Sequence, residues 1–142
     1  MEPPVRNPFV LRFTVTADDI DELDHVSNVR IVHWMNRAAV EHSTSLGFDV
    51  KRYRELGGVF VVRRHEIDYL ASARKGDELV AFTWPTVFQR SSAERRHEIR
   101  RVSDDRVIAR GFNLWAYVDF TTGRPTRIPP VLLEAFDPAR FV

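Results

Sequence analysis

A change of hydrophobic period near residue 20 constrains the fold of this chain more than any other feature. Phe9 to Thr16 has the alternation of a strand, and this run ends in a cluster of acidic residues. After the acids, apolar residues recur at spacings of three, four and seven, as they do on one face of a helix: Val32, Met35, Ala39 and Leu46. The sequence therefore predicts a strand, an acidic loop and then an amphipathic helix.

The predicted helix runs from Asn28 to Leu46, and its apolar face is widened by Ile31, Trp34 and Ala38. Ser27 and Asn28 are both suited to cap its start, and Gly47 is a typical helix stop. Asp21 lies in the loop just before this helix. The free N–H groups at a helix start favour negative charge, or an oxygen that becomes negative during a reaction.

The rest of the chain is predicted to be mainly strands joined by tight turns. The expected strands are Val59 to Leu70, Glu78 to Val87, Ala93 to Val102 and Arg106 to Phe120. Pro85 indicates an edge position or a bulge in the second of these. Short helices are expected over Asp49 to Leu56 and Val131 to Phe136. Short turns imply antiparallel neighbours, so the predicted class is α+β, an antiparallel sheet with helices on one side.

The strand predicted from Arg106 to Phe120 is apolar in both of its alternating phases. A strand of this kind is covered on both faces, and a single helix covers only one. We therefore expect a second subunit on the other face and predict a homo-oligomer.

Length and composition narrow the classes of protein. The 142 residues predict a single domain, spanning 1–142. The chain has no cysteine, which excludes disulfides, thiolate metal sites and a cysteine nucleophile. No apolar run is long enough to span a membrane, and the first seven residues do not resemble a secretion signal, so a cytoplasmic location is expected. A net charge of +1 gives no reason to predict nucleic-acid binding.

Three motifs in order resemble a known family. The first is Asp-x-Asp at residues 19–21, followed by residues 24–28, which read DHVSN where many family members read GHVNN. The second is a Tyr followed by Gly-Asp within residues 69–77, and the third is Asp-x-x-x-Gly-x-Pro at residues 119–125. With these motifs the chain resembles the hotdog-fold acyl-CoA thioesterases of the 4-hydroxybenzoyl-CoA thioesterase type. It departs from the family where Asp24 replaces Gly and where Ile31 replaces a common aromatic residue.

The resemblance implies a curved antiparallel sheet wrapped around one long central helix. It also implies dimers or tetramers with sites at subunit interfaces, acting on acyl-CoA or on acyl groups carried by an acyl carrier protein. Coenzyme A would enter only as part of the substrate, with no other cofactor. His33 and His42 lack partners at metal-ligand spacing, so no metal site is predicted.

By resemblance, Asp21 takes the position of the catalytic acid, as nucleophile or general base, and the first helical N–H groups near Asn28 hold the thioester oxygen. His25 either orients Asp21 and contacts substrate, or is a structural histidine bonded to a backbone carbonyl. Asn28 either binds substrate or only caps the helix, and the alternative for Asp21 is an ordinary loop acid. Glu41, on the polar face of the helix, is a reserve candidate whose simpler interpretation is a solvated charge.

Arg90, Ser91 and Ser92 lie where family members hold the coenzyme A phosphates, and arginine and serine suit phosphate chemically. An ordinary surface turn has the same composition. The basic stretches Arg63-Arg64, Arg95-Arg96 and Arg100-Arg101 allow two interpretations. They either meet the coenzyme A nucleotide or an acidic carrier protein, or they pair across strands with glutamates.

The leading functional hypothesis is thioester hydrolysis. The alternative is a non-catalytic acyl-CoA binding module on the same fold. A hydratase or dehydratase would need an Asp/His pair on a different loop, and the sequence has no such motif.

Overall fold

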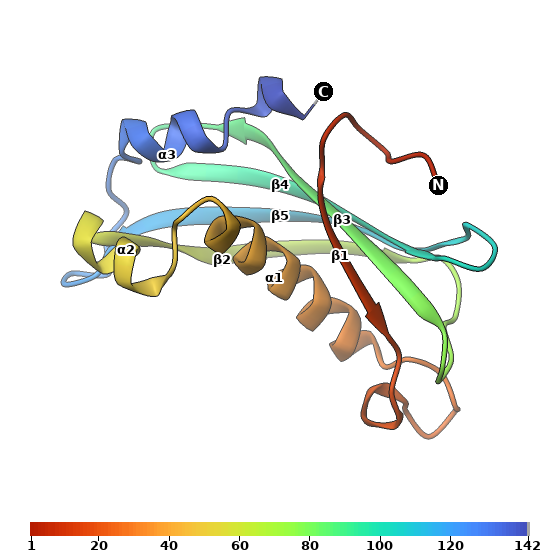
Figure 1. Cartoon of the computed structure of the whole chain (residues 1–142). Coiled ribbons are helices and arrows are strands. Elements are labelled where there is room, and N and C mark those ends of the chain that lie inside the picture. Colours follow the sequence, from red (N-terminus) through yellow and green to blue (C-terminus); the bar gives the residue numbers. More distant parts are fainter. Residues whose placement is uncertain (142) are drawn as a thin grey trace.

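The computed structural model describes residues 1–141, which form a five-stranded antiparallel sheet with helices packed against it (Figure 1). The strand order is β1-β3-β4-β5-β2. The strands are β1 (Phe9–Thr14), β2 (Gly58–Tyr69), β3 (Glu78–Phe88), β4 (Ser92–Arg101) and β5 (Val107–Asp119). The helices are α1 (Asn28–Ser45), α2 (Val50–Leu56) and α3 (Pro130–Ala135), with single 3₁₀ turns at η1 (Ala17–Asp19) and η2 (Pro138–Arg140). The predicted α+β class is confirmed.

Each predicted element is present, and no limit differs from the prediction by more than two residues. β1 ends at Thr14 rather than Thr16, because the Thr16 N–H donates to the Asp19 carboxylate at 2.8 Å and opens η1. α1 ends at Ser45 rather than Leu46, and Gly47 follows in the left-handed region with φ +91°. Glycine is favoured there because it has no Cβ to clash with the backbone.

The order of strands differs from the simple hairpin series that the sequence suggested. β2 pairs with β5 at one edge of the sheet and not with β3, which lies between β1 and β4. The reason is that residues 70–77, although they end in a tight turn at Arg74–Asp77, form a connection that carries the chain from one edge of the sheet to β3. Pro85 lies at a register shift before Val87, so the predicted bulge is confirmed. β3 is an interior strand, but its pairing with β1 ends at Thr83, before Pro85.

α1 packs its length against one face of the sheet (Figure 1). Met35 and Ala38 are completely buried and mark the centre of the contact. The predicted apolar face is therefore rotated: Val32 is only half-buried, and Leu46 is exposed. Gly111 of β5 allows the close approach, since a Cβ at this position would lie 2.7 Å from Met35 Sδ.

A second apolar cluster lies at the C-terminal end of α1. It joins α2 and α3 to the sheet through Phe48, Tyr53, Tyr117, Ile128, Leu132 and Phe136. Gly58 allows this packing, because a Cβ there would lie 2.6 Å from Tyr117 Cζ. The core thus has two parts, one along the N-terminal half and centre of α1 and one beyond its C-terminal end.

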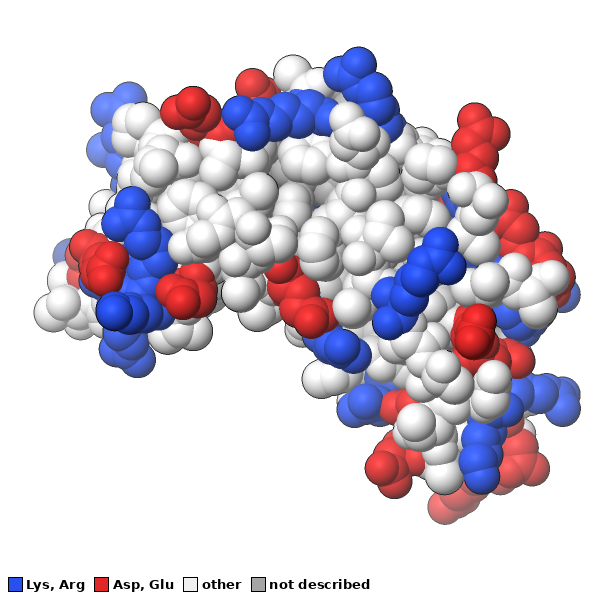
Figure 2. Space-filling model, in the orientation of Figure 1, with Lys and Arg blue, Asp and Glu red and all other residues white. Residues whose placement is uncertain are grey.

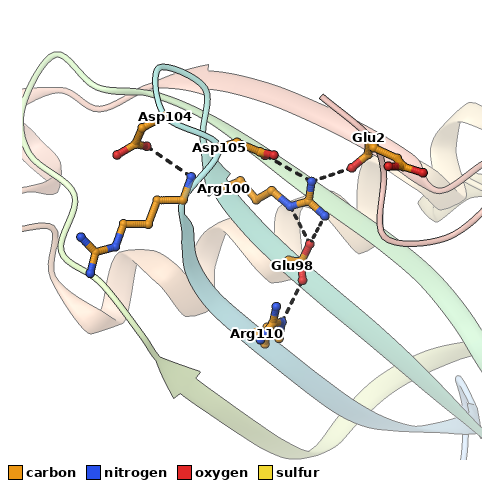
Figure 3. A network of polar contacts seen from close by, with 7 residues as sticks. Glu2, Glu98, Arg100, Asp104, Asp105 and Arg110 are labelled. Carbon is orange, nitrogen blue, oxygen red and sulfur yellow. Dashed lines mark hydrogen bonds and ion pairs between the residues drawn. The ribbon is translucent and has the colours of Figure 1, made fainter.

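The basic stretch Arg100-Arg101 of β4 is engaged by acids, and Figure 3 shows the network around Arg100. Glu98 accepts from Arg100 Nε at 2.7 Å and from Arg110 Nε at 2.8 Å. Arg100 also donates to the Glu2 carbonyl oxygen at 2.6 Å and to Asp105 at 3.2 Å, which ties the N-terminal segment to the sheet. Arg100 is thus paired with acids, but Glu98 lies on the same strand; the pair across strands is the one that Arg110 of β5 makes with Glu98.

The surface seen in Figure 2 carries its Lys, Arg, Asp and Glu side chains mainly toward the margins, around a broad uncharged area. This face has no continuous basic stripe of the kind that nucleic-acid binding uses. Within residues 1–141, no helix is long and apolar enough to cross a bilayer.

Candidate active site

The acidic loop before α1 is held by hydrogen bonds between Asp21 and its neighbours. Asp21 Oδ1 accepts from the Leu23 N–H at 2.9 Å and from the His25 N–H at 3.3 Å. The Asp21 N–H donates to the His25 carbonyl oxygen at 2.8 Å. The Asp21 side chain is exposed. The backbone of His25 thus orients the Asp21 carboxylate.

Asp21, His25 and Asn28 line one cavity of about 290 Å³, so the structure brings these three predicted residues together. Its other wall is the segment Tyr69–Ala73 with Ile108 of β5. The Val26 N–H donates to the Ala73 carbonyl oxygen at 2.9 Å, which fastens the two walls to each other. No role in the site was predicted for this second wall, although the Tyr and Gly-Asp motif that marks it is visible in the sequence.

The start of α1 leaves one backbone donor open. Ser27 is the N-cap, since its Oγ accepts from the Val29 N–H at 3.2 Å, so the capping role considered for Asn28 is wrong. The Ser27 carbonyl oxygen accepts from Arg30 and Ile31. Of the first four helical N–H groups, only that of Asn28 has no acceptor among residues 1–141. An open donor at a helix start suits an oxygen that carries negative charge.

The departure from the family's glycine has a structural consequence at Asp24. Its φ of +61° lies in the left-handed region. Glycine adopts this conformation without strain, whereas asparagine and aspartate are among the few other residues that tolerate it. Asp24 is thus one of the few residues besides glycine that fits the loop shape at this position.

A partly buried ion pair anchors the loop to α1. Asp19 is 4% exposed, and its carboxylate accepts from Arg30 Nε at 2.6 Å and from the Thr16 N–H at 2.8 Å. Burial alone raises the pKa of Asp19, but the hydrogen bonds from Thr16 and Arg30 outweigh it and hold the pKa below its usual value. The Ser27 N–H also donates to the Asp19 carbonyl oxygen at 2.9 Å. Asp19 therefore positions both the loop and the helix start.

Replacing Asp19 with asparagine is expected to lower the free energy of unfolding by about 2 kcal/mol at pH 7, because Arg30 loses its charged partner. The folded pKa of Asp19 lies below the unfolded value of about 3.9, so its contribution is complete above that pH and is lost as pH falls through the folded pKa. Urea unfolding at pH 7 and at several lower pH values should show that the difference in free energy of unfolding between the original protein and Asp19→Asn becomes smaller as the pH falls. Asp18→Asn, an exposed neighbour, is the control; an equal loss at every pH would contradict this assignment.

The structure places Arg90, Ser91 and Ser92 far from Asp21 within one chain. They form the hairpin between β3 and β4, whereas residues 70–77, which flank the Asp21 cavity, precede the other end of β3. Because a strand rises about 3.3 Å per residue, the length of β3 separates the two sites by roughly 33 Å. The hairpin is anchored by its backbone: the Ser91 carbonyl oxygen accepts from the Tyr117 N–H at 2.8 Å, and the Arg90 carbonyl oxygen accepts from the Ile128 N–H at 2.9 Å. Arg90 is exposed.

Glu41 lies away from the cavity. It is thirteen residues along α1 from Asn28, which corresponds to about 20 Å. Its carboxylate is 3.1 Å from Arg37 Nε on the same helix. Within residues 1–141, no group of three or more His, Asp or Glu side chains is arranged to hold a metal ion.

Comparison with known families identifies the class of protein. The model of the thioesterase-like superfamily matches residues 15–136. The chain belongs to this superfamily, which confirms at that level the resemblance seen in the motifs. Among curated proteins, none matches the sequence.

Solved structures agree with the fold. A 1,4-dihydroxy-2-naphthoyl-CoA thioesterase from Synechocystis has a TM-score of 0.84 at 17% identity, covering 92% of this chain and 96% of that one. A hypothetical protein from Staphylococcus aureus, in complex with CoA, has a TM-score of 0.83 at 15% identity, with 96% and 84% covered. A 12:0-ACP thioesterase from Umbellularia californica has a TM-score of 0.78 at 19% identity, with 92% of this chain covered but only 50% of that one. At these identities the likeness shows the fold.

Proposed function

We propose that this protein hydrolyses acyl thioesters of coenzyme A, or of an acyl carrier protein, to a free acid and a thiol. The observation that carries the proposal is one cavity lined by both Asp21 and Asn28, the residue whose N–H is open at the helix start. Membership of the thioesterase-like superfamily supports it. So do the similar folds of a CoA thioesterase, an ACP thioesterase and a protein in complex with CoA.

In the proposed reaction, the thioester carbonyl oxygen lies at the N–H of Asn28, where negative charge developing on that oxygen is stabilised. Asp21 either takes a proton from a water that attacks the carbonyl carbon, or attacks that carbon itself to form an anhydride that water then opens. The C–S bond breaks, the thiolate leaves and takes a proton, and the acyl group leaves as a carboxylate. No group beyond the protein and water is needed to balance the reaction.

Three finer assignments belong to the same proposal. The chain is a single hotdog domain, with the sheet curved around α1 as its central helix, and it is of the 4-hydroxybenzoyl-CoA thioesterase type. It assembles as a homodimer or homotetramer. Assembly is supported by the separation of Asp21 from Arg90–Ser92, since a second copy is needed to bring a phosphate-binding hairpin to the cavity. The outer side of the edge strand β2 is open to a partner in this chain.

Release of free thiol from a panel of acyl-CoA thioesters, followed with a thiol reagent, tests the function. We expect saturable turnover with at least one acyl group, and acyl groups of different length and aromaticity should differ in kcat/KM. An acyl-CoA that binds in calorimetry without any thiol release across the panel would instead indicate the non-catalytic binding module.

Light scattering tests the assembly. We expect a mass of at least two chains at micromolar concentration. A monomer mass would rule out the proposed coenzyme A role of Arg90, Ser91 and Ser92. Within one chain, the length of β3 separates these residues from the Asp21 cavity.

A further inference from the structure

An arginine outside the Asp21 cavity is bonded to the backbone of the cavity's second wall. Arg101 is the last residue of β4, its side chain is 17% exposed, and it is not among the described residues that line the cavity. Its Nη1 donates to the Ser72 carbonyl oxygen at 2.9 Å. Ser72 belongs to the wall formed by Tyr69–Ala73. The guanidinium therefore holds the wall from outside the cavity.

The Arg101 guanidinium is itself fixed in orientation by two acids. The Asp104 carboxylate, in the turn after β4, accepts from Arg101 Nε at 3.0 Å and from Nη2 at 3.1 Å. Asp77 Oδ2 accepts from Nη1 at 3.4 Å. A forked pair between a guanidinium and a carboxylate fixes the plane of the guanidinium. Asp104 thus keeps Nη1 directed at the Ser72 carbonyl oxygen.

Asp77, the acid of the Gly-Asp motif, connects this arginine to the rest of the site. Its Oδ2 also accepts from the Arg74 N–H at 3.0 Å and closes the turn that follows the wall. Its carbonyl oxygen accepts from the Val15 N–H at 2.9 Å, between the end of β1 and the acidic loop. The motif therefore joins Arg101, the second wall and the start of the loop that carries Asp21.

The remaining hydrogen bonds of the wall leave the Ser72 carbonyl dependent on Arg101. The N–H groups of Leu70 and Ala71 donate to the Ile108 carbonyl oxygen at 2.8 and 3.2 Å, so the start of the wall is fastened to β5. Within residues 1–141, the Ser72 carbonyl oxygen has no hydrogen-bond donor besides Arg101. Loss of the guanidinium would release this part of the wall.

We propose that Arg101 is a positioning residue: by holding Ser72 and Asp77, it sets the distance between the two walls of the candidate active site. The consequence for catalysis rests on the proposed function, since the walls align a bound thioester with Asp21 and the N–H of Asn28. A misplacement of about 1 Å between reacting groups lowers a rate by about a hundredfold. Loss of Arg101 should therefore lower kcat more than it raises KM.

Thiol release by three variants tests the catalytic consequence. Arg101→Gln should lower kcat at least about tenfold, with KM changed less than about threefold. Arg101→Lys keeps a positive charge for Asp77 and Asp104 but not the forked geometry, so it should retain most of the thermal stability and still have a low kcat. Arg106→Gln is the matched control, because Arg106 is an exposed arginine of the next turn that belongs to no ion pair within residues 1–141. A purely structural role would lower the midpoint of thermal unfolding and leave kcat of the folded protein unchanged.

Hydrogen exchange of the Val26 amide measures the contact between the walls without any substrate, because this N–H donates to the Ala73 carbonyl oxygen at 2.9 Å. We expect its exchange to be at least about tenfold faster in Arg101→Gln and unchanged in Arg106→Gln. The Met35 amide, in the middle of α1, is the internal reference for unfolding of the whole chain and should exchange as in the original protein.

A second variant keeps the proposal testable if Arg101→Gln does not fold. Asp104→Asn changes a side chain that is 48% exposed, weakens the hold on the guanidinium, and should speed Val26 exchange in the same direction. Faster Val26 exchange in Arg101→Gln, together with no thiol release by the original protein from any acyl-CoA, would reject the hydrolysis and support the positioning of the wall. Unchanged Val26 exchange in the Arg101 and Asp104 variants, or an unchanged kcat of Arg101→Gln in an active protein, would overturn the proposal.

Discussion

Replacing Asp21 with asparagine is expected to lower thioester turnover by at least about a hundredfold, the scale of losing a general base. Asparagine keeps Oδ1 as an acceptor for the N–H groups of Leu23 and His25, so the loop keeps its shape while the carboxylate loses its charge and basicity. The side chain is exposed and makes little contribution to the core. Thiol release from the best acyl-CoA of the panel measures the effect, with circular dichroism as the folding control.

Two matched variants separate the role of Asp21 from a general effect of charge. Glu22→Gln changes the adjacent loop acid, which does not line the cavity, and should leave kcat within a few-fold of the original. Glu41→Gln removes the reserve candidate, whose carboxylate pairs with Arg37 about 20 Å from Asn28 along α1. Full activity of Asp21→Asn, or loss of activity in Glu41→Gln alone, would show that the carboxylate is misassigned while leaving the fold intact.

Replacing Met35 with alanine is expected to lower the free energy of unfolding by about 3 kcal/mol, because it opens a cavity in the centre of the helix–sheet contact. Met35 is completely buried, and the sheet approaches it closely at Gly111. The midpoint of thermal unfolding should fall by roughly 6 to 12 °C. Val29→Ala, at a position that is 74% exposed on the same helix, should change it little.

A double-mutant cycle gives the Met35 prediction its specificity. Gly111→Ala alone should destabilise the protein, since the added Cβ would lie 2.7 Å from Met35 Sδ. In the Met35→Ala background, Gly111→Ala fills part of the new space. The destabilisation that Gly111→Ala causes should therefore disappear or become a stabilisation. A coupling energy of about 1 kcal/mol or more from denaturant unfolding is expected. Simple additivity of the two changes would show that this contact does not set the helix–sheet spacing.

Local patterns in the sequence were sufficient for most of the elements and for part of the site. Hydrophobic period, Ser27 and Gly47 located α1 to within one residue at its C-terminal end, because caps and stops act through neighbouring backbone groups. The motif order placed Asp21, His25 and Asn28 together, and they line one cavity. These residues lie within eight positions of one another, so local geometry brings them close.

Other parts of the site depend on contacts between distant segments. The wall formed by Tyr69–Ala73 reaches the Asp21 loop only because β2 crosses to the far edge of the sheet, beside β5. A hairpin series and this crossed order share the same alternation of residues, so hydrophobic period does not distinguish them. The positioning role of Asp19, through Arg30 and the Thr16 N–H, likewise follows from the folded loop and not from its acidic composition.

The burial of Arg95 is the clearest feature that the sequence pattern does not predict. β4 carries charged residues in both phases, so its pattern of alternation does not indicate which arginine faces the helix and which faces outward. The register with β3 and β5 turns Arg95 inward to His42 and Thr83 and leaves Arg96 exposed. The sequence by itself determined the element types, the helix limits and the acidic loop, because these depend on neighbouring residues. Only the tertiary structure decided the strand order, the second wall of the Asp21 cavity and the burial of Arg95, because pairing between distant strands determines which side chains lose contact with water.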